Sequence, residues 1–414
     1  MTRAYLDHAS TTPPRPEALA ALIRWMALPA ADPGRLHQEG RTVRDALEEA
    51  RQQVAWLVGA TPREIVFTSG GTESINAAVW GATRRRPGAP VLCADVEHSA
   101  VRDASARLAP TEVLPVDGAA LVQTDALEAR LRATDVPRPA LVHCQWANHE
   151  VGTLQPVRET VRLCRDAGVP VHVDAAAACG HVPLDLDDLG ADLVSLSAHK
   201  IGGLPGAGAL VVRRGSRFEP LIVGGEQERA RRAGLEALPA LLAFGAAAAA
   251  LGDDGQRLLR SEARSARRHI DALETAATAV PGVELVGPRA EDQRLPSLLC
   301  LGCLLYTSPQ RQHQPVRTLP GRRAAQEPGL VGNELGLHPA VGGQERRRVG
   351  VGPQMEDGDL DDGHYCCTNM TGLPSGSLMA ARVGPPGTSK GSSSKVAPSA
   401  TDLSIEARRS PTWM

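Results

Sequence analysis

The 414-residue sequence lacks an excess of charge of either sign, with 45 Lys and Arg residues against 47 Asp and Glu residues. A net charge of −2 offers no electrostatic footprint for nucleic acid or for an anionic membrane. The longest apolar run, 238–251, is interrupted by Pro239 and diluted by alanines, whereas a membrane span needs about 20 strongly apolar residues. Asp7 and His8 precede any apolar run, which is atypical of a secretory signal peptide. We therefore expect a soluble, cytoplasmic protein without nucleic-acid or membrane partners.

The sequence also lacks the cysteine patterns of disulfide frameworks and zinc sites. Its eight cysteines include one Cys-x-x-Cys pair, Cys300 and Cys303, and no second pair at a zinc-site spacing. In a chain of this length we expect reduced thiols and no metal site.

Up to about residue 303, short apolar runs alternate with amphipathic helical patterns. The runs predict strands at Ile65–Thr68, Val91–Ala94, Ala140–Gln145, Val169–Val173, Leu193–Leu196 and Ala209–Arg213. Helices are predicted at Arg41–Leu57, Thr72–Arg84, Thr124–Ala133 and Val157–Ala167. This alternation predicts an α/β fold with a mainly parallel sheet covered on both faces, in which ligands bind at the carboxyl ends of the strands.

The domain organisation is predicted from changes in composition along the chain. We expect an N-terminal segment, 1–14, that packs with a small domain; a large ligand-binding domain, 15–252; the start of an incomplete small α+β domain, 253–306; and an atypical tail, 307–414. A helix at 256–279, with Arg260, Glu262, Arg264, Arg267 and Arg268 on its polar side, opens the small domain. In the tail, Gly and Pro make up roughly a quarter of the residues, as in disordered chains. The tail is either naturally disordered or, as we favour, the product of a change of reading frame near Leu304, because the strand-rich segment before it is never completed.

Two polar residues that follow apolar strands suggest chemistry. Lys200, in the stretch Ser197-Ala198-His199-Lys200, suits a Schiff base with a carbonyl cofactor, although a surface lysine in a glycine-rich turn is the simpler reading. Asp174 ends the run Val171-His172-Val173 and could pair with the pyridine nitrogen of pyridoxal phosphate, although a strand-end aspartate is also a common helix N-cap.

Two further motifs lie where the same sheet edge is expected. The stretch Thr68-Ser69-Gly70-Gly71-Thr72 joins a strand to a helix and could form a phosphate cup, or a plain turn in which Thr72 caps the helix. His98 follows the strand at Val91–Ala94 and could stack on a flat ring and move protons, or lie alone at the surface. The conjunction of cup, histidine, aspartate and lysine at strand carboxyl ends favours the functional readings.

These motifs resemble those of the cysteine desulfurase and selenocysteine lyase family, pyridoxal-phosphate enzymes of the class V aminotransferase group with the aspartate-aminotransferase-like fold (PLP fold type I). The stretches that carry the resemblance are Tyr5–Pro13, Thr68–Glu73, Glu97-His98, Asn148–Thr153, His172–Ala175, Ser197–Lys200 and Gly224–Arg229. They extend over about three-quarters of the chain.

The resemblance implies a role for each matching residue. Lys200 would hold pyridoxal 5'-phosphate as a Schiff base and shuttle the α-proton, and His98 would stack on the ring. The phosphate would be bound by Gly71, Thr72, Ser197 and His199. Asp174 would pair with the pyridinium nitrogen, and Asn148 and His149 lie in the motif that contacts the cofactor's phenolic oxygen.

The implied activity is removal of sulfur from L-cysteine, or from selenocysteine its selenium. It would give L-alanine and an enzyme persulfide, made by a cysteine thiolate, for a sulfur-acceptor protein in iron–sulfur cluster or thiocofactor assembly. The family also implies a homodimer.

The chain departs from the family at several positions. His149 replaces a second asparagine, Ala177 replaces a glutamine, and Leu235 replaces a threonine that reaches the phosphate across the dimer interface. Neither the loop cysteine nor the arginine for the substrate carboxylate is found beyond residue 303. Another class V aminotransferase or β-lyase, or a catalytically inactive truncated remnant, is therefore kept as an alternative.

Overall fold

The computed structural model describes residues 4–27, 31–303 and 366–369. All of them belong to one compact unit, Met1–Gly372. The predicted tail, 307–414, lies outside the described residues except for the strand at Cys366–Asn369, so its two explanations stay open.

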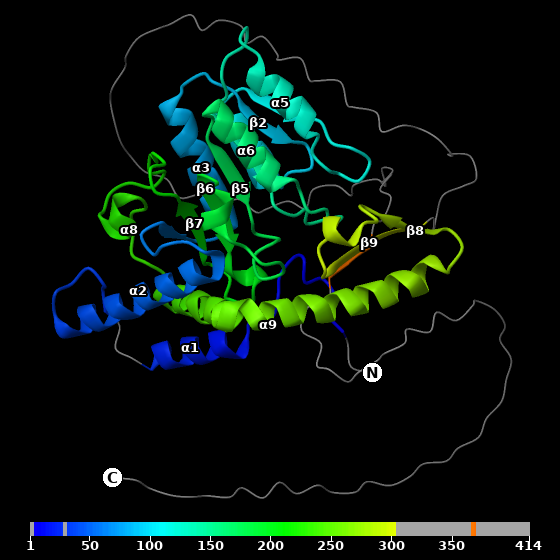
Figure 1. Cartoon of the computed structure of the whole chain (residues 1–414). Coiled ribbons are helices and arrows are strands. Elements are labelled where there is room, and N and C mark those ends of the chain that lie inside the picture. The colour runs from blue at the N-terminus through cyan, green and yellow to red at the C-terminus, as the bar shows by residue number, and fades with distance from the viewer. Residues whose placement is uncertain (1–3, 28–30, 304–365, 370–414) are drawn as a thin grey trace, which may run out of the picture. The chain divides into compact units, whose positions relative to one another are not determined.

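A seven-stranded sheet forms the centre of the described chain (Figure 1). Its strand order is β1-β7-β6-β5-β4-β2-β3. Its strands are β1 (Ile65–Thr68), β2 (Val91–Ala94), β3 (Thr111–Leu114), β4 (Leu141–Gln145), β5 (Val171–Asp174), β6 (Leu193–Ser197) and β7 (Gly208–Val212). β7 is antiparallel to both of its neighbours, β1 and β6, whereas the pairs β6–β5, β5–β4, β4–β2 and β2–β3 are parallel. The predicted mainly parallel sheet is thus confirmed.

Helices cover both faces of this sheet, and the alternation of side chains along the strands shows how. Val66, Leu141 and Leu210 pack with alanines of α3 in one hydrophobic core. Their sequence neighbours, such as Val142 and Val211, belong to the larger core on the other face, with residues of α2, α6 and α9. The helices are α1 (Pro16–Met26), α2 (Gln38–Val58), α3 (Gly71–Arg85), α4 (Ser99–Leu108), α5 (Thr124–Arg132), α6 (Val157–Ala167), α7 (Leu186–Leu189), α8 (Gln227–Ala230) and α9 (Leu238–Thr278).

The long helix α9 links the central sheet to a second, smaller one (Figure 1). It passes through the predicted boundary at 252/253, and its residue Gln256 is left-handed, with φ of 64°. The small sheet has the order β10-β9-β8 and is antiparallel. Its strands are β8 (Val283–Val286), β9 (Leu298–Cys303) and β10 (Cys366–Asn369).

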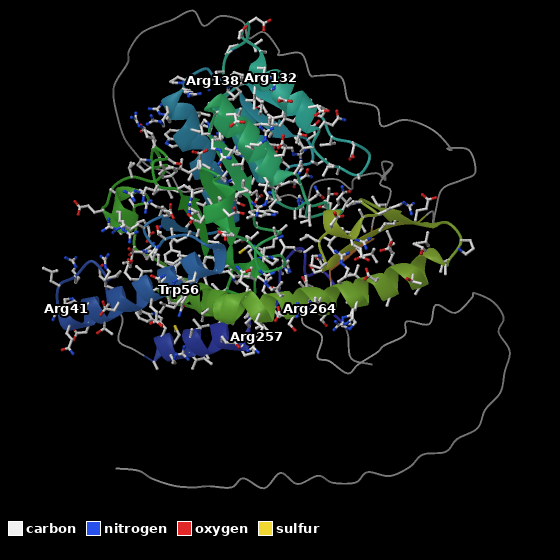
Figure 2. All side chains as sticks on the ribbon, in the orientation of Figure 1. Arg41, Trp56, Arg132, Arg138, Arg257 and Arg264 are labelled. Carbon is white, nitrogen blue, oxygen red and sulfur yellow. The ribbon has the colours of Figure 1, made fainter. Side chains whose placement is uncertain are left out.

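The predicted polar side of α9 divides between solvent and protein. Arg264 extends from α9 in Figure 2, and Arg260, Arg264 and Arg268 are exposed. Arg267 instead donates to the carbonyl oxygens of Glu291 and Arg294, at 3.0 and 2.6 Å, and so holds the segment before β9. In the part of the chain that the structure describes, no helix combines the length and apolar character needed to span a membrane.

Candidate active site

The carboxyl ends of β1, β2, β4, β5 and β6 meet at one edge of the central sheet, where a cavity of about 1120 Å³ opens. Every residue that the sequence singled out for this site lines the cavity: Gly71, Thr72, His98, Asn148, His149, Asp174, Ser197, His199 and Lys200. Segments separated by more than 100 residues are thus brought together, as expected for a ligand site at the carboxyl edge of an α/β sheet.

Lys200 ends a single 3₁₀ turn, Ala198–Lys200, that directly follows β6. Its Nζ atom donates a hydrogen bond to the Ala9 carbonyl oxygen. Burial lowers the pKa of the Lys200 ammonium, and the nearby carboxylates of Asp174, Asp7 and Glu150 oppose this shift. A lysine with a lowered pKa supplies more neutral amine near pH 7, which is the form that attacks a carbonyl.

Asp174 is the last residue of β5 and is only 8% exposed. Its Oδ1 atom accepts the Ala176 N–H at 3.0 Å. Burial raises the pKa of the Asp174 carboxyl, whereas that hydrogen bond and the charges of His98 and Lys200 lower it. The helix N-cap alternative is wrong, because a turn follows Asp174 and the next α-helix begins only at Leu186.

The turn between β1 and α3 offers donors to an anion. Gly70 is the N-cap of α3, and no side chain caps the helix, so the alternative in which Thr72 caps it is wrong. Within the described residues, the N–H groups of Gly71 and Thr72 have no hydrogen-bond acceptor, as is usual for the first turn of a helix. A Cβ atom at Gly71 would lie 3.5 Å from the Ser197 Cβ atom, so the absent side chain leaves the space between the turn and Ser197 open.

The remaining phosphate-side candidates face the same space. Ser197 is 4% exposed and makes no side-chain hydrogen bond to another described residue. The His199 Nδ1 atom lies 3.1 Å from the Thr11 Oγ1 atom, so this ring is oriented by the N-terminal segment. A helix N-terminus with an adjacent hydroxyl and imidazole is a suitable set of donors for a phosphate.

His98 and His149 lie on the same side of the cavity, with ring centroids 5.1 Å apart. The His98 Nδ1 atom accepts the Ala100 N–H at 3.0 Å, which places the proton of a neutral ring on Nε2. Burial lowers the pKa of His149 to about 4, with contributions from the charges of His98, Lys200 and Arg102. His149 is therefore a neutral imidazole near pH 7.

Asn148 is held mainly by its own loop. Its Oδ1 atom accepts the N–H groups of Glu150 and Val151, both at 2.9 Å, and its Nδ2 atom donates to the Val96 carbonyl at 3.0 Å. One amide hydrogen remains for a ligand. Ala177, where the family pattern has glutamine, also lines the cavity and leaves a hydrogen-bonding position unfilled.

The N-terminal segment contributes more than the sequence predicted. Thr12 donates through its N–H and its hydroxyl to the His199 carbonyl, at 2.9 and 2.8 Å. Arg15 donates to the Ile201 carbonyl at 3.0 Å and pairs with Glu262 of α9 at 2.5 Å. Thr12 and Arg15, which do not belong to the sheet, thus hold the turn on which Lys200 lies. In the sequence, the stretch Tyr5–Pro13 resembled the family, but no residue of it was assigned a role.

The five cysteines whose side chains the structure describes are poorly placed for a nucleophile. Cys93, Cys144, Cys164, Cys179 and Cys300 are buried. Burial raises the thiol pKa of Cys93, Cys164 and Cys179 to about 12 and that of Cys144 further. Thiols with such pKa values are protonated, and hence unreactive, near neutral pH.

Comparison with known proteins identifies the family. Residues 4–304 match the family model described as aminotransferase class-V. The chain is 40% identical over 312 residues to a cysteine desulfurase from Cereibacter sphaeroides, which covers 73% of this chain and 76% of the relative. It is 39% identical over 249 residues to cysteine desulfurase IscS from Dictyoglomus turgidum, covering 59% of this chain and 62% of that protein. The latter match thus spans less than two thirds of the relative.

A solved structure of a NifS-like protein from Rickettsia africae superposes with a TM-score of 0.67 at 28% identity, covering 74% of this chain and 82% of that one. The fold and the sequence matches agree. The chain therefore belongs to the class V aminotransferase family of pyridoxal-phosphate enzymes, within its cysteine desulfurase group.

Proposed function

We propose that the protein is a pyridoxal-phosphate-dependent cysteine desulfurase. It would convert L-cysteine and a thiolate into L-alanine and a persulfide: the thiolate bonds to the substrate sulfur, the carbon–sulfur bond breaks, and a proton replaces sulfur on the carbon. The observation that carries the proposal is the grouping of Lys200, Asp174 and an uncapped helix N-terminus around one cavity. The 40% identity to a cysteine desulfurase supports the choice of reaction within the family.

The residues around the cavity fit pyridoxal 5'-phosphate. The N–H groups of Gly71 and Thr72, with Ser197 and His199, would bind its phosphate, and the space left by the missing Gly71 side chain favours this. Asp174 would accept the N–H of the ring, His98 would stack on the ring, and Asn148 and His149 would lie near its phenolic oxygen. When bound, the cofactor supplies an electron sink for negative charge at the substrate's α-carbon.

The chain's own groups would handle the protons. Lys200 would hold the cofactor covalently and, when released, would take the α-proton at Nζ, a task favoured by its lowered pKa. The Ala9 carbonyl oxygen would hold the free Lys200 amine in place between these steps. His98, with Nδ1 occupied by the Ala100 N–H, could give or take a proton only at Nε2.

We infer that the persulfide forms on a thiolate other than the buried cysteines described above. Their raised thiol pKa values support this. A sulfur-acceptor protein in the assembly of iron–sulfur clusters or thiocofactors is the proposed destination of the sulfur. Selenocysteine is kept as an alternative substrate, and the cytoplasm is the proposed location.

We also propose that the protein acts as a homodimer. The stretch that would cross the dimer interface ends in Leu235, which is 63% exposed, and Val223, on the other side of α8 in the sequence, is 73% exposed. Surface apolar side chains of this kind are typical of interaction sites. Because Leu235 offers no hydroxyl, it would contribute packing rather than a phosphate contact.

The test uses the full-length protein incubated with pyridoxal 5'-phosphate, L-cysteine and excess dithiothreitol as the thiol. We expect cofactor absorbance, borohydride-stable attachment at Lys200, and equal amounts of alanine and sulfide. Pyruvate with ammonia, or amino transfer to a keto acid, would instead support another class V activity. A protein that binds no cofactor would support the inactive remnant. Lys200→Ala is the negative control, and size-exclusion chromatography with light scattering tests the dimer.

A further inference from the structure

A second carboxyl group lies in the floor of the cavity beside Asp174. Glu97 follows β2, lines the cavity, and is 3% exposed. Its Oε1 atom accepts the backbone N–H of Gln145 at 2.7 Å. Gln145 is in turn the strand partner of Asp174 across β4 and β5. Glu97 is thus hydrogen-bonded to the residue of β4 that pairs with Asp174 of β5.

The surroundings of Glu97 do not suit a negative charge. Its Oε2 atom is buried and has no hydrogen-bond partner among the described residues. The titratable groups that face it are Asp174 on β5, Cys144 on β4 and Cys93 on β2, none of them a cation. A buried carboxylate without a cation or a full set of donors is strongly unfavourable, so such groups take up a proton.

Asp174 differs from Glu97 in its electrostatic neighbours. Burial raises the pKa of Asp174 too, but the Ala176 N–H and the charges of His98 and Lys200 oppose this rise. No described cation acts on Glu97 in this way, so of the two carboxyl groups Asp174 is the better suited to a negative charge and Glu97 to a proton. Because the charge of Asp174 acts on Glu97, the two carboxyl groups titrate as a coupled pair. The first proton goes to the carboxylate that its surroundings stabilise less.

We propose that Glu97 is a positioning residue for Asp174: it is the neutral acid of the pair and leaves Asp174 as the single carboxylate at the floor of the cavity. Its side-chain Oε1 atom holds the end of β4 by accepting the Gln145 N–H. Its proton removes a like charge that would otherwise raise the cost of an ionised Asp174. The inference rests on the proposed function for the role of Asp174, but the state of Glu97 can be tested without the cofactor.

The first experiment measures urea unfolding of the full-length, cofactor-free protein from pH 5 to 8, with the wild type and Glu97→Gln. Burial and Asp174 raise the pKa of Glu97 in the folded protein to about 8, from an ordinary 4.5. In this window the folded state holds a proton that the unfolded state has lost. The Glu97 contribution to stability is therefore present below pH 4.5 and lost as the pH rises toward 8. One such proton increases the unfolding equilibrium constant by up to about tenfold per pH unit.

Glu97→Gln keeps the shape and the acceptor for Gln145 but cannot ionise, so we expect it to remove that slope. Glu64→Gln is the matched control. Hydrogen bonds from Thr61 and Arg214 and the charge of Arg213 outweigh burial and lower the pKa of Glu64. Its stabilisation is present above pH 4.5 and lost only as the pH falls below it, so this variant should leave the slope from pH 5 to 8 unchanged.

Equal slopes for the wild type and Glu97→Gln would overturn the proposal. If Glu97→Gln fails to fold, infrared spectroscopy of the wild type and Asp174→Asn at pH 7 decides instead. The carbonyl band of a protonated carboxyl group should be present in both, and its absence from both would refute a neutral Glu97.

A second readout tests the link to Asp174. With pyridoxal phosphate bound, Glu97→Gln should keep the wild-type midpoint in a pH titration of the cofactor's absorbance, whereas Asp174→Asn should shift it. A shifted midpoint in Glu97→Gln would contradict the positioning role. If neither the wild type nor any variant binds the cofactor, but the pH dependence of unfolding still differs between the wild type and Glu97→Gln, the proposed function is contradicted and the neutral state of Glu97 is supported.

Discussion

The phosphate-side turn depends on a buried ion pair that is distant in sequence, and breaking this pair should be among the most destabilising changes in the molecule. Arg51 of α2 and Glu228 of α8 have side chains that are 2% and 1% exposed. Arg51 donates Nη1 to Oε2 at 2.5 Å and Nη2 to Oε1 at 2.8 Å. The same Oε2 atom accepts the N–H of Phe67 in β1 at 2.8 Å. Glu228 therefore links α2 and α8 to β1, the strand that precedes the glycine turn of the proposed phosphate site.

Glu228→Gln should lower the free energy of unfolding by about 3–5 kcal/mol, the usual cost of leaving one partner of a buried pair uncompensated. The amide has a single oxygen for three donors, so at least one guanidinium N–H would face an NH₂ group. Arg51→Met/Glu228→Gln should be less destabilised than the sum of its single variants, because neither charge remains.

Glu48→Gln is the control for this prediction. Glu48 also contacts the Arg51 Nε atom, at 3.2 Å, but its side chain is 37% exposed. Its loss should cost less than about 1 kcal/mol. Urea unfolding at pH 7 of the wild type, Glu228→Gln, Arg51→Met, the double variant and Glu48→Gln gives the comparison. If Glu228→Gln lowers the free energy of unfolding no more than Glu48→Gln does, the Arg51–Glu228 pair does not stabilise the fold as its geometry indicates.

Three further changes test the site. Lys200→Ala should abolish borohydride-stable attachment of the cofactor and lower alanine formation from cysteine by at least about 100-fold, with an unchanged circular dichroism spectrum. Gly71→Ala should weaken cofactor binding, measured by absorbance titration, because its methyl group, in ordinary contact with the Ser197 Cβ atom at 3.5 Å, would fill the space proposed for the phosphate. It should not lower the melting temperature, since alanine favours a helix over glycine by up to about 1 kcal/mol. Replacing Cys93, Cys164 and Cys179 by serine should leave alanine formation intact, and the native wild type should resist labelling by iodoacetamide at these positions, as thiol pKa values of about 12 require.

The strands predicted from the sequence are those whose residues are apolar on both faces. The prediction Ile65–Thr68 coincides with β1, and Leu193–Leu196 falls one residue short of β6. β3, Thr111–Leu114, was not predicted, because as an edge strand it is only partly buried and has no continuous apolar run. The antiparallel direction of β7 was not predicted either, because strand direction is set by the connection and leaves no mark on the apolar pattern.

For the site, the sequence indicated residues at strand ends but not the residues that hold them from other elements. Lys200 and Asp174 could be singled out because each follows an apolar run. Ala9 could not, because it acts through a backbone carbonyl, which carries no side-chain signal. The isolation of the Glu97 Oε2 atom likewise depends on what packs around it, and only the folded chain contains that information.

The direction of β7 has a consequence for the cup itself. Because β7 is antiparallel to both β1 and β6, its first residue, Gly208, pairs with Thr68 on one side and with Ser197 on the other. These two residues precede the glycine turn and the Lys200 turn. A Cβ atom at position 208 would lie 2.6 Å from the Gly70 Cα atom, closer than any side chain tolerates. Glycine at this position therefore allows the two halves of the proposed phosphate site to approach each other. The spacing between the N-terminus of α3 and Ser197 thus depends on Gly208, which lies outside the stretches that carry the family resemblance.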